Sequence, residues 1–130
     1  MFNLEDYVSH YVAQLAGPNH ENAWHSLVEV GSTALPLVVE ALGAASDPRV
    51  RFSLVTVISE YRSAEAVPVL GRLLRDRNAG IWKAALDGLV TAGGQAALDA
   101  LASAKADAGP QQREWIDEAV GQITEARRPG

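Results

Sequence analysis

Apolar residues recur along this chain at a fixed step of 31 residues, and no other feature constrains its fold as strongly. Three rows follow the step: Ala23, Leu54, Ala85 and Ile116; Leu27, Ile58, Leu89 and Val120; and Val30, Tyr61, Ala92 and Ile123. Within each unit the three positions are spaced i, i+4 and i+7, which places them on one face of an α-helix. A chain built this way folds by stacking its units, not by closing one irregular core.

A second apolar pattern follows the first in each unit. Its rows are Leu35, Val67 and Leu98; Val38, Leu70 and Leu101; and Leu42 and Leu74. The spacing of i, i+3 and i+7 again marks one face of a helix. Each unit is therefore expected to contain two amphipathic helices, with Pro36 and Pro68 near the start of second helices, where a missing N–H costs least.

Turn-forming residues stand where this pattern requires breaks. Gly31-Ser32, Arg62-Ser63 and Gly93-Gly94 separate the two helices of a unit, and Asp47-Pro48, Asp76-Arg77-Asn78 and Gly109-Pro110 separate neighbouring units. Glycine, capping side chains and proline favour helix ends and starts at these places. We predict helices near 3–16, 19–30, 32–44, 48–60, 64–76, 79–92, 94–106 and 110–125.

Residues 47–51 (Asp-Pro-Arg-Val-Arg), 66–70 (Ala-Val-Pro-Val-Leu) and 73–76 (Leu-Leu-Arg-Asp) resemble the pattern of the HEAT repeat family, in its short bacterial form related to the phycobilin-lyase type of repeat. Residues 81–86 and 97–101 match this pattern less closely. The resemblance covers roughly 19 to 125. It implies an all-α fold, a right-handed α-solenoid of stacked antiparallel helix pairs with about eight helices.

The expected organisation is one HEAT-like domain over residues 1–126. A capping helix at 1–17 precedes helix pairs at 19–46, 48–77 and 79–107, and a second capping helix follows at 110–126. Each end helix is expected to turn a polar face outward, because the ends of a short solenoid otherwise expose its core. Residues 127–130 are expected to form a disordered tail.

The amino-acid composition limits the cellular compartment and the kinds of covalent and metal sites that we expect. The chain has no cysteine, which excludes disulfides and thiolate zinc sites and fits a reducing compartment. No basic region with an apolar run opens it, and no segment approaches the ~20 apolar residues of a membrane-spanning helix. We therefore expect a cytoplasmic protein that does not enter a membrane.

Charge is distributed unevenly. Residues 1–47 hold six acidic and no Lys or Arg side chains, residues 48–83 hold seven basic against three acidic, and residues 84–130 hold four basic against seven acidic, which gives the net charge of −5. Nucleic-acid binding depends on clustered Lys and Arg, so the overall negative charge argues against this function. A basic middle between two acidic ends remains.

No residue pattern points to an enzyme. The pair His20-Glu21 resembles a motif of the HEAT-related deoxyhypusine hydroxylases, but one pair supplies too few ligands for an iron site, so no metal or cofactor is expected. His25 and Ser26 are adjacent on a helix and diverge by about 100°. The three tryptophans resemble an ingredient of HEAT-like DNA glycosylases, yet tryptophan at helical spacing more often packs between repeats.

The basic middle suggests a binding surface. In HEAT-type stacks the second helices line the concave side, which is the usual binding face. The predicted partner-binding residues are Arg49, Arg72, Arg75, Arg77, Val69, Leu37 and Glu40. Arginine forks suit carboxylates, so the expected partner is another protein with an acidic surface. In the competing interpretation, Arg51 pairs with Glu21 or Glu60, and Arg75 with Asp47 or Asp76, and the charges merely neutralise one another.

Two classes of function remain open. The first is a non-catalytic protein-binding module, an adaptor or an immunity-type inhibitor, acting as a monomer or weak homo-oligomer. The alternative is a ligand- or chromophore-handling module resembling the phycobilin lyases, and a DNA-binding protein of the glycosylase type is more remote. A shallow charged groove favours the first, and an enclosed aromatic pocket around Tyr61 and Trp82 favours the second.

Overall fold

The computed structural model describes residues 3–127, and within them it contains eight α-helices and one short 3₁₀-helix. Their bounds are α1 Leu4–Gln14, α2 His20–Val30, η1 Ser32–Ala34, α3 Leu35–Ala44, α4 Pro48–Glu60, α5 Ala66–Leu73, α6 Ala79–Ala92, α7 Gly94–Asp107 and α8 Pro110–Ala126. The all-α prediction is confirmed. The expected disordered tail falls largely on residues 128–130, which lie outside the described range.

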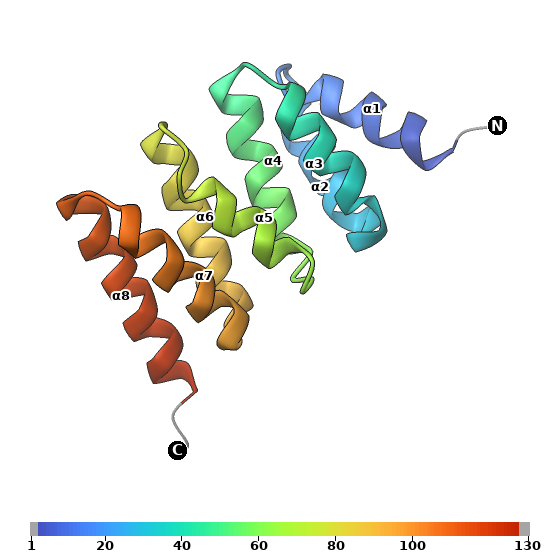
Figure 1. The fold of residues 1–130 in the computed structure, drawn as a ribbon. Helices are drawn as coiled ribbons and strands as arrows, with labels where there is room; N and C mark the ends of the chain where they lie inside the picture. The colour runs from blue at the N-terminus through green and yellow to red at the C-terminus, as the bar shows by residue number, and fades with distance from the viewer. Residues whose placement is uncertain (1–2, 128–130) are drawn as a thin grey trace.

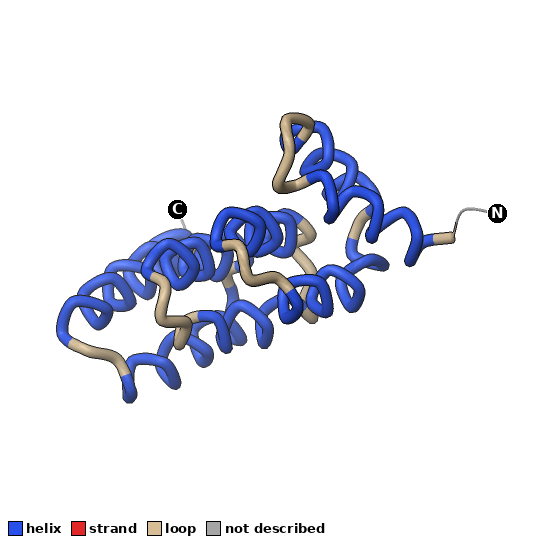
Figure 2. Tube along the Cα trace, turned by 90° about the horizontal axis from the view of Figure 1, so that it is seen from above, coloured by secondary structure: helices blue, strands red, loops and turns tan. Residues whose placement is uncertain are grey.

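The helices stack in two layers, with α1 and α8 at opposite ends (Figures 1 and 2). The first helices of the units, α2, α4, α6 and α8, pack successively on one another, and α3, α5 and α7 form the second layer. α1 packs on α2 and α3. α5 packs closely on α7 and much less on α3, so the second layer is tight only towards the C-terminal end.

The core follows the rows predicted from the 31-residue step. Leu27, Ile58 and Leu89 are fully buried, and Val120 packs against the same core from a half-buried position. Ala23, Leu54, Ala85 and Ile116 are also fully buried. Ala92 departs from the pattern, because it is exposed at the last residue of α6. The merged rows form one continuous apolar interior.

Most predicted helix limits agree with the structure, and α5 is the main exception. We predicted a helix over 64–76, whereas α5 ends at Leu73. The N–H groups of Leu74, Arg75 and Asp76 donate to carbonyls three residues earlier, so the backbone tightens into a 3₁₀-type turn. Similarly, the predicted 32–44 helix begins with the separate 3₁₀ turn η1.

The turn between the helices of each unit places its first residue at positive φ. Gly31 has φ 83°, Gly93 has φ 64°, and Arg62 stands at the equivalent step with φ 50°. Glycine adopts this region without steric cost, but a residue with a Cβ does not. The middle repeat therefore contains a strained turn that the other two repeats avoid.

Replacing Arg62 by glycine is expected to stabilise the fold by about 0.5–1 kcal/mol, because the left-handed conformation then meets no Cβ. Urea denaturation followed by circular dichroism measures the change. Gly93→Ala is the matched control and is expected to destabilise by a similar or larger amount. An Arg62→Gly variant less stable than wild type would contradict this interpretation of the turn.

α4 and α6 approach each other closely at Gly88. A Cβ added there would lie 2.3 Å from Ser59 Oγ and 3.0 Å from a methyl carbon of Leu70. Two side-chain hydrogen bonds join the preceding pair of first helices: Trp24 Nε1 donates to Thr56 Oγ1 at 2.8 Å, and the Tyr61 hydroxyl donates to the Leu27 carbonyl at 2.8 Å. Burial raises the pKa of Tyr61 to about 12, so the hydroxyl stays a donor.

Leu70→Ala is expected to lower the free energy of unfolding by about 2–5 kcal/mol, because Leu70 is 1% exposed and fills the space beside Gly88. Chemical denaturation measures the loss. The exposed neighbour Arg72→Ala serves as control, with an expected effect within about 0.5 kcal/mol. Equal effects for the two variants would show that α5 does not face the core as described.

Candidate protein-interaction surfaces

The arginines predicted to form one basic patch are separated in the structure. Arg75 turns towards α7, where its guanidinium donates to the Asp107 carboxylate at 3.1 and 3.3 Å and to Ser103 at 3.4 Å. Arg72 lies one turn earlier but lines a different hollow. The expectation that both project to one side assumed a helix through residue 76, and α5 ends before Arg75.

Arg72 lines a hollow of about 510 Å³ between α3 and α5. The hollow exists because these two helices pack weakly on each other. Val69 also lines it but is only 9% exposed and belongs to the core, so its expected role as exposed apolar surface is wrong. Within residues 3–127 the four ion pairs of the structure do not involve Arg72.

The other predicted partner-binding residues fall in three further places. Half-buried Leu37 and exposed Glu40 line a hollow of about 320 Å³ between α3 and α1. Arg77 is exposed in the loop before α6. Arg49 lies at the start of α4 and lines a hollow on the layer of first helices. The seven residues thus do not form one surface, and Arg49 is separated from Arg72 and Arg75.

The charge-neutralising interpretation holds for two arginines, although with partners other than those considered. Arg51 in α4 pairs with Asp76, which follows α5 in the same unit, and the two side chains are only 24% and 15% exposed. The Arg51 guanidinium holds the pKa of Asp76 below its ordinary value, and the Asn78 N–H assists. The Arg75–Asp107 pair joins this unit to the next one, and it uses an arginine that the patch prediction assigned to a partner.

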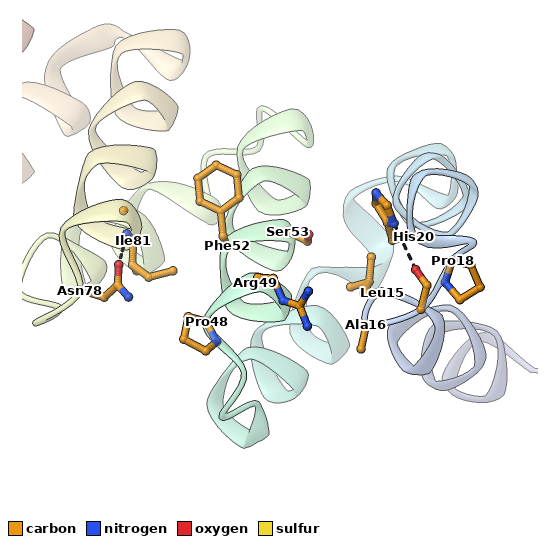
Figure 3. A pocket seen from close by; sticks show the side chains of 12 residues that line it. Leu15, Ala16, Pro18, His20, Pro48, Arg49, Phe52, Ser53, Asn78 and Ile81 are labelled. Carbon is orange, nitrogen blue, oxygen red and sulfur yellow. Dashed lines mark hydrogen bonds between the residues drawn. The ribbon is translucent and has the colours of Figure 1, made fainter.

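A hollow of about 620 Å³ lies where the first helices begin. Its residues come from the α1–α2 connection and from the starts of α2, α4 and α6 (Figure 3). They are Leu15, Ala16, Gly17, Pro18, His20, Pro48, Arg49, Phe52, Ser53, Asn78, Gly80 and Ile81. Pro18 and Gly80 occupy the repeat positions equivalent to Arg49, and these short residues leave both flanks of Arg49 open.

Phe52 stands at the edge of this hollow with 47% of its surface exposed. Together with Gly80 it also lines a second hollow of about 410 Å³ between α4 and α6, so the two spaces are contiguous. We call these two hollows the Phe52 groove. In the other units the equivalents of Phe52 are Glu21, Lys83 and Glu114. The sequence analysis did not predict Phe52 as a binding residue. A comparison of equivalent repeat positions could have found it, because Phe52 is the one aromatic residue where the other units have charged side chains.

Lys83 occupies the far part of the groove and is held by two tryptophans. Its Nζ lies 4.6 Å from the ring centre of Trp115 and 5.6 Å from that of Trp82, and the two rings meet edge to face at 6.0 Å. Trp115 is 41% exposed. Such cation–π contacts hold the ammonium in place. Neither Trp82 nor Tyr61 lines the two hollows of the Phe52 groove, so the groove is not the aromatic pocket that the chromophore alternative requires.

Across residues 3–127 no cluster of three or more His, Asp or Glu residues has the arrangement of a metal site. Nδ1 of His20 is hydrogen-bonded to the Gly17 carbonyl at 3.1 Å, and His10 to Gln14 at 2.8 Å. In the same part of the chain no single helix is long and apolar enough to cross a membrane. One pair of consecutive segments, α2 and Ser32–Ala44, has the necessary length and composition only when the two are taken together, and they are bent by 99° relative to each other.

Comparison with known proteins agrees with the stacked helix pairs. The family model for HEAT repeats matches residues 35–121, from the start of α3 into α8. The chain belongs to the HEAT repeat family. HEAT repeats generally mediate protein interactions and are typically non-catalytic scaffolds. No curated protein sequence matches the chain.

Asp76→Asn is expected to destabilise the protein by about 1–3 kcal/mol at pH 7, because it removes the charged partner of a partly buried arginine. The lowered pKa means that this contribution is complete above pH ~4, the ordinary Asp range, and is lost as the pH falls through the folded-state value. Denaturation curves between pH 3 and 7 should therefore converge for wild type and variant at the acid end. Exposed Asp87→Asn is the control, and a pH-independent difference would contradict this role for Asp76.

Proposed function

We propose that this protein is a non-catalytic protein-binding module, an adaptor or immunity-type inhibitor, that takes its partner at the Phe52 groove. The observation that supports this most is the half-exposed phenylalanine between two contiguous hollows. Exposed large aromatics are typical anchors of protein interfaces, because a partner that covers them removes apolar surface from water. HEAT repeats generally bind proteins, which agrees with this reading.

The repeat architecture explains why such a surface is available. The core is closed by aliphatic rows, and no buried polar or charged residue occurs among residues 3–127. The interior therefore needs neither Phe52 nor Arg49, which project from the outer side of α4 one turn apart (Figure 3). A rigid stack that presents such side chains can bind without reorganising, which reduces the entropic cost of association.

A second candidate surface lies on the layer of second helices, where the sequence predicted the partner to bind. The hollow between α3 and α5 combines Arg72 with apolar Val39 and Leu73. It is smaller than the Phe52 groove, and it borders neither Arg49 nor a large exposed aromatic. We therefore propose the second-helix face as the second candidate surface for an acidic partner and the Phe52 groove as the first.

Site-specific photo-crosslinking tests the choice between the two surfaces. Benzoylphenylalanine is placed at position 52, 72 or, as control, at exposed Thr124 in α8, and the protein is irradiated in the cells that produce it. A discrete adduct with another protein is expected from position 52 and not from Thr124, and mass spectrometry identifies it. In a pull-down of the identified partner with the unlabelled protein, Phe52→Ser should abolish capture while changing stability by less than about 1 kcal/mol.

The competing outcomes are distinct. A stronger adduct from position 72, together with loss of partner capture by an unlabelled Arg72→Glu, Arg75→Glu double variant, would move the interface to the second-helix face. Equal adducts from all three positions would contradict a specific groove. An adduct of the protein with itself would identify a homo-oligomer, which light scattering of the purified chain measures independently.

A further inference from the structure

We infer that the Phe52 groove recognises an acidic segment of a partner protein that carries a large apolar side chain beside its carboxylates. This inference rests on the proposed function and adds the chemistry of the partner. It follows from two properties that occur together at the start of α4: an apolar surface with a half-exposed aromatic side chain, and a largely exposed arginine beside it.

The apolar part is formed by residues from three units of the stack. Phe52 is half exposed, and Leu15, Pro48 and Ile81 line the same hollow. Its volume of about 620 Å³ exceeds what one side chain fills, so it accommodates an aromatic or leucine side chain together with adjoining backbone. Such an anchor would cover Phe52 and gain the free energy of removing both surfaces from water.

The polar part favours a carboxylate. Arg49 and His20 line the hollow, and no Asp or Glu lines it. Asp47 contacts the Arg49 guanidinium at 3.5 Å, but its other oxygen accepts the Arg49 N–H at 2.9 Å and caps α4. The Arg49 side chain is 83% exposed, so this long contact contributes little. Its remaining N–H donors face the hollow and can bind a carboxylate in a forked arrangement.

The charges in the far part of the groove determine the orientation of a bound segment. There Glu60 and Asp87 line the wall with Lys83, whose ammonium is held against Trp115 and Trp82. Like charges disfavour a carboxylate at this end. The acidic residues of a bound segment are therefore expected at the Arg49 end, with the apolar anchor over Phe52. Because the net charge of the chain is −5, long-range attraction favours basic peptides, and selection of acidic ones must come from the groove itself.

Peptide display provides the test. A random peptide library on phage is selected against the immobilised wild-type protein and, in parallel, against Arg49→Glu, and chosen peptides are synthesised with fluorescein for anisotropy titration. Wild type is expected to enrich Asp or Glu next to an aromatic or leucine residue. Arg49→Glu should weaken these peptides about tenfold or more, the value of one charge-assisted hydrogen bond, and should itself select basic residues at the same place. Arg127→Glu, an equal charge change at the far end, is the control.

The outcomes separate this inference from the proposed function. Selected peptides that lose binding in Phe52→Ser but show no acidic preference, or bind Arg49→Glu unchanged, overturn the partner chemistry and leave the groove as the interface. Peptides that bind wild type and Phe52→Ser equally overturn the groove. A library that yields no enrichment counts against recognition of a linear segment. A swap of charge preference between wild type and Arg49→Glu supports the inference directly.

Discussion

The structure depends on close contact between successive first helices, and that contact is tightest where α4 meets α6. Gly88 has no side chain, so α6 can approach Ser59 of α4 while Leu70 of α5 fills the adjoining space. This approach lets the buried rows of neighbouring units merge into one interior. Removing apolar surface from water is the main stabilising contribution to such an interior, and it requires that no gap opens between units.

Charge has a different role in the two layers. Arg51 with Asp76 ties α4 to the segment that follows α5 within one repeat, and Arg75 with Asp107 joins that repeat to the next. Arg49 is largely exposed and makes only a long contact with Asp47. These paired arginines contribute to the packing of the stack, whereas an arginine with only one long contact keeps hydrogen-bonding capacity for a partner. The basic middle of the sequence is thus divided between structure and a candidate interface.

The groove beside Phe52 arises from irregularity in the repeat. An ideal array would place similar residues at each equivalent position, and here Pro18 and Gly80 flank Arg49 while charged residues stand at the equivalents of Phe52. Short side chains beside long ones leave hollows, and an aromatic among them supplies apolar surface. A HEAT stack can gain a specific face in this way without any change in its core.

The sequence by itself determined the stacked helix pairs, because burial every 31 residues fixes which faces of the helices turn inward, and the limits of α4 and α6 followed from Asp-Pro and from asparagine and glycine at their ends. It did not determine which arginines share a surface. That depended on α5 ending at Leu73, which turns Arg75 towards Asp107, and on weak packing between α3 and α5. Local patterns encode burial, whereas the partners of long exposed side chains are set by contacts between repeats about 30 residues apart, and only the tertiary structure decides these.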